Sequence, residues 1–226
     1  MFFKDLLSRI YDSNHSEFVA VCGRRRVGKT FLVREFFEEE MVFQCAGVAN
    51  AGTQEQLKSF FHTLRRYDKR VATMPTDWID AFEMLISYLD SIHQARKVVF
   101  IDELPWMDTQ GAQFVSALEH FWNSWASARH DIILIVCGSA TSWMMDKLIN
   151  NHGGLYGRLT HRIFLSPFTL STPRAVPNPT TSASPWQTIV KRNGRGFTLR
   201  AVRTSHPLSP LSAQCRYACP WRCRKW

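Results

Sequence analysis

The residues best suited to chemistry form the run Gly23-Arg24-Arg25-Arg26-Val27-Gly28-Lys29-Thr30. This run matches the loop that binds nucleotide phosphates, in which a glycine, four variable residues and Gly-Lys-Thr follow one another. The two glycines allow backbone N–H groups to turn toward phosphate oxygens, and the positive end of a following helix adds to that field. Lys29 is expected to reach the β and γ phosphates, and the Thr30 hydroxyl to bind Mg²⁺. We therefore predict that the 23–30 loop binds ATP.

A second candidate element follows about 70 residues later, where an apolar run at 98–101 ends in Asp102 and Glu103. A buried strand that ends in carboxylates is typical of a Walker B element, whose aspartate holds Mg²⁺ directly or through water. Glu103 stands one residue further on, where a carboxylate can act as the general base for the attacking water. A solvated strand end explains this pattern equally well on its own, but its pairing with the 23–30 loop favours the metal and base roles.

A third candidate is Ser139, which follows the apolar run 132–137. A small polar side chain at the end of a strand beside the Walker B strand can hydrogen-bond the attacking water or the γ-phosphate, a role called sensor 1. The alternative is an ordinary helix N-cap, because serine is favoured at that position.

Arginines near the end of the ordered pattern are candidates for the cation that stabilises the transition state. Arg158 is the first choice and Arg162 the second, since a cation supplied in cis or by a neighbour can neutralise charge on the transferred phosphoryl group. An exposed arginine that is only solvated is the alternative. Arg24, Arg25 and Arg26 could contact phosphates, although a solvent-facing rim is the simpler interpretation of three variable loop positions.

The elements that must position these residues alternate between strand and helix. Unbroken apolar runs predict strands at 17–22, 41–48, 97–102, 132–137 and 161–165. Apolar residues at helical spacing predict helices at 28–40, 53–67, 77–93, 113–125 and 142–150. This alternation indicates an α/β fold in which helices cover both faces of a parallel five-stranded sheet.

Four motifs in this order resemble a known family. They are the run at 23–32, Phe-Ile-Asp-Glu-Leu-Pro-Trp-Met at 100–107, Cys-Gly-Ser-Ala at 137–140 with Trp143-Met144, and Leu-Tyr-Gly-Arg at 155–158. Together they resemble the prokaryotic archaeal-type ATPases, relatives of the AAA+ and signal-transduction P-loop NTPases, over about residues 17–170. The resemblance implies the strand order 5-1-4-3-2, ATP with Mg²⁺, and the roles given above to Glu103 and Ser139. The Arg-Glu box that commonly precedes the first strand is missing, and no lid, winged-helix or nuclease-like pattern follows residues 166–168.

The composition changes at residue 171. Residues 171–226 contain ten Lys and Arg but no Asp or Glu, whereas residues 1–170 contain 18 and 19, so the formal net charge of +9 arises in the tail. Seven of the ten prolines lie there and the apolar periodicity is lost. We therefore expect a P-loop ATPase domain at 1–170 and a disordered, basic, Pro-rich tail at 171–226. Because composition and family pattern fail together, we interpret this tail as the product of a shifted or truncated reading frame.

Several function classes are disfavoured. No apolar run approaches the roughly 18 residues that cross a bilayer, and Lys4 and Asp5 interrupt any secretory signal, so the cytoplasm is expected and a membrane is not. The tail cysteines have CxxxC spacing without a recognisable fourth ligand, so zinc is not expected; these are Cys215, Cys219 and Cys223. Three further cysteines lie in apolar runs and are expected to be reduced and buried; these are Cys22, Cys45 and Cys137.

The sequence thus favours an ATP-binding P-loop ATPase that hydrolyses ATP with Mg²⁺ and acts as a nucleotide-driven switch, alone, as a homo-oligomer or with a protein partner. One alternative is a nucleic-acid-binding protein whose tail arginines engage phosphates while Trp221 or Trp226 stacks on bases. Those arginines are Arg192, Arg195, Arg200, Arg203, Arg216, Arg222 and Arg224. Another alternative is a truncated protein that binds ATP with weak or no turnover, because part of the catalytic environment in this class comes from a lid or a neighbouring subunit.

Overall fold

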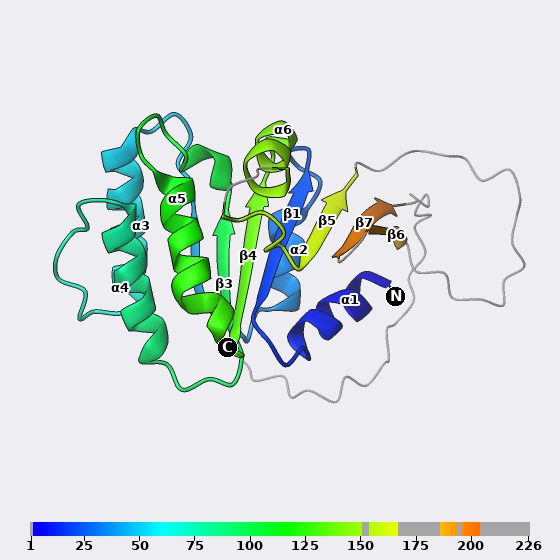
Figure 1. Cartoon of the computed structure of the whole chain (residues 1–226), viewed down its shortest axis with the longest axis horizontal. Coiled ribbons are helices and arrows are strands. Elements are labelled where there is room, and N and C mark those ends of the chain that lie inside the picture. The colour runs from blue at the N-terminus through cyan, green and yellow to red at the C-terminus, as the bar shows by residue number, and fades with distance from the viewer. Residues whose placement is uncertain (1, 151–153, 167–185, 194–195, 204–226) are drawn as a thin grey trace, which may run out of the picture.

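The computed structural model describes the backbone of residues 2–150, 154–166, 186–193 and 196–203, and the side chains of residues 5–150 and 154–166. Its strands form one sheet in the order β2-β3-β4-β1-β5-β7-β6 (Figure 1). The strands are β1 (Glu17–Gly23), β2 (Met41–Ala46), β3 (Lys97–Asp102), β4 (Ile132–Gly138), β5 (His161–Leu165), β6 (Trp186–Asn193) and β7 (Gly196–Arg203).

The first five strands are parallel. β1 lies between β4 and β5, and β3 lies between β4 and β2. This confirms the predicted order 5-1-4-3-2. Every residue of β1, β3 and β4 is buried, as expected for central strands that are covered on both faces.

Helices α1 and α2 cover one face of the sheet, and α3, α4 and α5 cover the other. The described helices are α1 (Phe2–Tyr11), α2 (Lys29–Phe36), α3 (Thr53–Tyr67), α4 (Trp78–Asp90), α5 (Phe114–His120) and α6 (Thr141–Met144). Leu7 and Val33 share a buried cluster with Val19, whereas Leu57 and Leu118 pack on the opposite side of β1. In Figure 1, α3, α4 and α5 stand to the left of the central strands and α1 to their lower right.

Several helices differ from the sequence expectation. α1 was not predicted, and α4 covers Trp78–Asp90 rather than 77–93. α2 ends at Phe36 rather than at residue 40, because Glu38, Glu39 and Glu40 would place three carboxylates at the negative end of the helix dipole. The helix predicted at 113–125 continues after α5 as a π turn at Phe121–Trp125. A similar π turn at Met145–Ile149 follows the short α6.

The C-terminal segment also differs from expectation. β6 and β7 pair antiparallel, from Trp186 opposite Arg203 to Asn193 opposite Gly196, and β7 runs parallel to β5. These strands contradict the expectation of disorder at 186–193 and 196–203. Residues rich in Thr, Val, Ile and Phe flank Asn193-Gly194, the strongest short hairpin signal, and the backbone of β5 offers pairing groups at the sheet edge. Residues 171–185 and 204–226, with Cys215, Cys219, Cys223, Trp221 and Trp226, lie outside the described residues, as do the side chains of 186–203.

The parallel register gathers the predicted functional residues at one edge of the sheet. Ile101 of β3 pairs with Val136 of β4, and Cys22 of β1 pairs with Gly138. The segments that follow these three strands therefore emerge side by side, at the carboxyl ends where open parallel sheets bind ligands. Within the described part of the chain, no helix is long and apolar enough to cross a membrane.

Candidate nucleotide-binding site

The 23–30 loop joins β1 to α2, as its sequence predicts. Gly28 has a φ of 88° and stands at the N-cap of α2, a left-handed conformation that favours glycine. At Gly23, a Cβ atom would lie 2.3 Å from the carbonyl oxygen of Leu165 on β5. Both glycines are therefore required by the backbone, one by conformation and the other by the close approach of a neighbouring strand.

The Lys29 ammonium lies inside the loop. The residue is 6% exposed, and its Nζ donates hydrogen bonds of 2.9 Å to the carbonyl oxygens of Gly23 and Arg24. A cation held in this way, next to the N-terminus of α2, gives the loop a positive interior suited to an anion.

Thr30 meets Asp102, although 72 residues separate them in the chain. The Thr30 hydroxyl donates to Asp102 Oδ2 over 2.6 Å, and the backbone N–H of Glu103 donates to the other carboxylate oxygen over 2.8 Å. Asp102 is 7% exposed. The two predicted metal ligands are thus neighbours, joined by a hydrogen bond between their oxygens.

Glu103 and Ser139 are also brought together. The Ser139 hydroxyl donates to Glu103 Oε2 over 2.9 Å. Glu103 has a left-handed backbone with a φ of 47°, which is uncommon for a residue with a side chain and is often found at functional sites. The helix begins at Thr141, with Ala140 as its N-cap residue and no side-chain cap. The alternative that Ser139 only caps this helix is therefore wrong.

The loop arginines differ in their surroundings. Arg25 Nε approaches Ser139 Oγ to 3.5 Å, and its guanidinium carbon lies 5.8 Å from the centroid of the Trp106 ring. A pocket of about 480 Å³ opens here. It is lined by Arg25, Arg26, Gly28, Lys29, Thr30, Phe31 and Glu103.

Three thiols lie beneath or beside this site. Burial raises the pKa of Cys22 to about 12, against the opposing effect of the nearby Lys29 charge. Burial also raises the pKa of Cys137, and the neighbouring Asp102 raises it further. Burial has the same effect on Cys45. All three cysteines are free and buried, which confirms the prediction and keeps these thiols neutral around the charged loop.

Sequence reasoning missed the role of Gln56. This residue of α3 is 1% exposed. Its amide accepts from the N–H of Val48 over 2.9 Å and donates to the carbonyl oxygens of Val48 and Trp106 over 2.6 and 2.9 Å. Gln56 thereby ties the segment after β2 to η1 (Leu104–Trp106), the turn that follows Glu103. The sequence signal that could have indicated this role is a glutamine at a position of α3 that faces the core with Leu57, Phe60 and Leu64.

The structure does not bring Arg158 to the loop. Arg158 is exposed, and its backbone N–H closes a turn on Leu155. The turn precedes β5, whose first residue pairs with Val19, whereas the last residue of β5 pairs with Gly23 beside the loop. Arg158 therefore lies near the amino end of β5, away from the 23–30 loop. Arg162 lies within β5, opposite Ala20.

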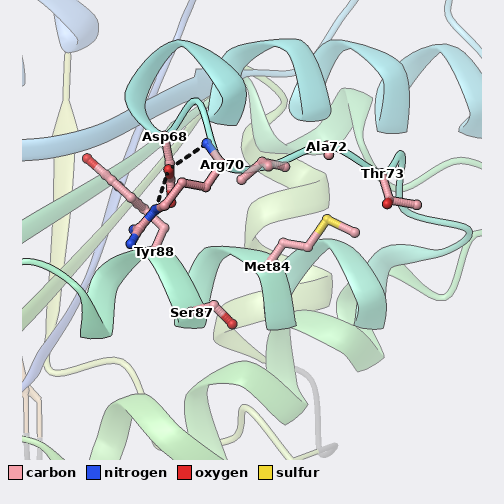
Figure 2. A pocket seen from close by; sticks show the side chains of 8 residues that line it. Asp68, Arg70, Ala72, Thr73, Met84, Ser87 and Tyr88 are labelled. Carbon is pink, nitrogen blue, oxygen red and sulfur yellow. Dashed lines mark hydrogen bonds and ion pairs between the residues drawn. The ribbon is translucent and has the colours of Figure 1, made fainter.

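A second pocket lies between α4 and the segment that follows α3. It measures about 370 Å³, and Figure 2 shows its polar end, where Arg70 contacts Asp68, and its apolar wall at Met84. Arg70 donates to both carboxylate oxygens of Asp68. These opposite charges offset each other, so the pocket lacks the positive interior of the 23–30 loop. Among the described residues there is no group of three His, Cys, Asp or Glu that could hold a metal ion.

Comparisons with known proteins agree with this fold. The profile of a family described as an ATPase domain predominantly from Archaea matches residues 5–180. An uncharacterised protein of Methanocaldococcus jannaschii is 26% identical over 166 residues, which are 71% of this chain and 34% of that protein. The Walker-type ATPase PABY2304 of Pyrococcus abyssi has the same fold, with a TM-score of 0.51 and 18% identity over 73% of this chain and 52% of that chain.

The chain thus spans about a third of the first relative and about half of the second. The family match covers most of the chain and includes every strand of the parallel core. The chain belongs to the ATPase domain family found predominantly in Archaea, and its parallel core has the P-loop NTPase fold.

Proposed function

We propose that this chain binds ATP with Mg²⁺ at the 23–30 loop and hydrolyses it. The observation that carries the proposal is the 2.6 Å contact between Thr30 Oγ1 and Asp102 Oδ2. These are the metal-binding positions of two separate motifs, and the chain folds so that their oxygens meet beside the buried Lys29 ammonium. Hydroxyl and carboxylate oxygens next to a fixed cation suit a magnesium-bound triphosphate.

The available ligands fit Mg²⁺. One hydroxyl and one carboxylate from the protein leave the remaining octahedral positions to phosphate oxygens and water, the usual arrangement for this ion. When bound, Mg²⁺ would neutralise negative charge on the β and γ phosphates. Thr30 and Asp102 would hold it, and the Glu103 backbone N–H, which donates to Asp102 Oδ1, would keep that carboxylate in place.

Glu103 is proposed as the general base and Ser139 as the residue that orients it. Glu103 lines the same pocket as Lys29 and Thr30, so its carboxylate can reach a water beside the γ phosphate. The Ser139 hydroxyl donates to Glu103 Oε2 and leaves Oε1 available to accept the proton of that water. Proton transfer to a positioned base typically contributes 10²–10⁴-fold to a rate.

A nucleotide-driven switch is the proposed biological use of this reaction. η1 follows Glu103 directly, and Gln56 connects η1 to α3 and to the segment after β2. A shift of Glu103 between nucleotide states would therefore move these elements. Arg158 could reach a nucleotide only in a neighbouring copy, so its proposed role requires a homo-oligomer.

The proposal is tested by calorimetric titration of the full chain with ATP, with Mg²⁺ and with EDTA, followed by measurement of phosphate release. Wild-type protein should bind Mg·ATP, and chelation of the metal should weaken binding. Lys29→Ala should bind Mg·ATP about 100-fold more weakly. Lys58→Ala, which changes an exposed lysine on α3, should behave as wild type. ATP binding that is equal in the Lys29→Ala protein would overturn the assignment.

A further inference from the structure

We propose that Arg25 is a catalytic residue that supplies the transition-state cation within its own chain. The inference rests on the proposed function and adds a residue to it. Arg25 occupies a variable position of the 23–30 loop, so the motif assigns it no task. Its place in the structure gives it one, because its side chain contacts the group that orients the proposed base.

Arg25 and Glu103 share a single partner. Arg25 Nε lies 3.5 Å from Ser139 Oγ, and the same hydroxyl donates to Glu103 Oε2 over 2.9 Å. The guanidinium is thus two contacts away from the proposed base. A water held by Glu103 must approach the γ phosphate closely in order to react, so a cation at this distance from Glu103 faces the phosphoryl group that is transferred.

The aromatic ring of Trp106 helps to fix this position. Its centroid lies 5.8 Å from the guanidinium carbon of Arg25, within the range of a cation–π interaction. Trp106 belongs to η1, and its carbonyl oxygen accepts a hydrogen bond from Gln56. The exposed Arg25 side chain, which lines the pocket, is therefore held by a residue that is itself anchored. An arginine that was only solvated would not need such a contact.

The other arginines fit this task less well. Arg24 contributes its backbone carbonyl to Lys29 and does not line the pocket that contains Glu103. Arg34 donates to Gln44, and Arg158 lies toward the opposite end of β5. Arg26 lines the pocket, but no described contact joins it to Ser139 or Glu103. Arg25 alone among the described loop arginines has such a contact.

The chemical step balances without a further reactant. The water oxygen forms a bond to the γ phosphorus, the bond from that phosphorus to the bridging oxygen breaks, and the water proton passes to Glu103. ADP leaves with the electron pair of the broken bond. Arg25 keeps its protons and donates N–H groups to the γ-phosphoryl oxygens as charge redistributes. Arginine has five N–H donors, so its approach to Ser139 through Nε leaves the terminal groups for this contact.

The test compares the full wild-type chain with Arg25→Ala, Arg25→Lys and Arg65→Ala, the last a matched loss of charge at an exposed position of α3. Three quantities are measured: the Kd for Mg·ATP by calorimetry, the rate of phosphate release in a single turnover with protein in excess, and the Kd for Mg·ADP with and without aluminium fluoride. The fluoride complex mimics the transferred phosphoryl group. It therefore reports on the transition-state contacts even when turnover is slow.

Arg25→Ala should lower the rate about 10³-fold, the usual effect of a lost transition-state arginine, while the Kd for Mg·ATP changes less than about threefold. Aluminium fluoride should tighten ADP binding in wild type and in Arg65→Ala but not in Arg25→Ala. Arg25→Lys should recover only part of the loss, because it keeps the charge without the planar fork.

Two results would overturn the role of Arg25 and leave the proposed function intact. One is a rate and a fluoride response within threefold of wild type in Arg25→Ala. The other is a loss of ATP affinity as large as the loss of rate, which would make Arg25 a ground-state binding residue. Failure of wild-type protein to bind Mg·ATP would instead refute the proposed function and, with it, this inference.

Discussion

Replacement of Glu103 by glutamine separates ATP binding from hydrolysis. The amide oxygen of glutamine can accept the hydrogen bond that Ser139 now donates to Glu103 Oε2 over 2.9 Å. The bond from the residue 103 backbone N–H to Asp102 is unaffected by the change of side chain. The Kd for Mg·ATP should therefore stay within about twofold of wild type. Loss of the proton acceptor should lower the hydrolysis rate about 10²–10⁴-fold, equivalent to roughly 3–5 kcal/mol in the barrier.

The assay is phosphate release in a single turnover with protein in excess, so that product release does not limit the rate. Calorimetry gives the Kd for Mg·ATP in the same preparations. Glu83→Gln, an exposed carboxylate on α4, is the matched control and should equal wild type in both measurements. A hydrolysis rate within threefold of wild type in Glu103→Gln would place the base at another residue. Loss of ATP binding in that variant would refute the division between binding and catalytic groups.

Three further changes test other parts of the structure. Lys29→Ala should raise the Kd for Mg·ATP about 100-fold, the scale of lost charge-assisted hydrogen bonds, with unchanged circular dichroism. Asp131→Asn removes the charge partner of Lys97, which is 3% exposed, and should lower the free energy of unfolding in urea by about 3–5 kcal/mol at pH 7. Hydrogen bonds from Arg129 hold the pKa of Asp131 well below its usual range, so this difference should shrink as the pH falls below about 4. Gln56→Leu leaves unpaired the backbone groups of Val48 and Trp106 that Gln56 bonds, and should lower the free energy of unfolding in urea by about 2–3 kcal/mol. An unchanged free energy of unfolding would show that Gln56 does not tie these segments together.

The central part of the fold could be predicted from the sequence because apolar residues fill the middle of its central strands, as at 98–101 and 132–137. β3 and β5 begin and end at the predicted residues, although Lys97, Asp102 and His161 at their ends are not apolar. α1 was missed even though Phe3, Leu7 and Ile10 recur at the spacing of one helix face. Among the side chains of α1 that the structure describes, Leu7 and Ile10 are buried in the core. The hairpin of β6 and β7 was missed because overall composition outweighed the local Asn193-Gly194 signal.

The candidate site could be predicted as far as its motifs have fixed chemical roles. Lys29, Thr30 and Asp102 could be predicted as candidates because a phosphate loop and its metal ligand need those residue types at those places, and the structure brings Thr30 and Asp102 together. Arg158 was chosen from its motif, whereas its position before the strand at 161–165 already indicates the opposite end of the sheet from the loop. A residue that precedes a parallel strand belongs to the amino end of that strand, whereas ligands bind at the carboxyl ends. Arg25 was overlooked as an individual because its distinguishing contacts, to Ser139 and Trp106, join segments far apart in the chain.

The two halves of the site differ in how the fold holds them. Lys29 and Asp102 are buried at the ends of regular elements, so the groups proposed to bind the triphosphate and its metal are held in place by the fold. Glu103, Ser139 and Arg25 are instead joined to one another by side-chain contacts. The terminal N–H groups of Arg25 can meet the γ phosphoryl oxygens while Nε keeps its contact with Ser139, so that these three residues act together on the attacking water and the transferred group. Any change at these residues should therefore reduce turnover more than binding, since their contacts strengthen only as charge redistributes in the transition state.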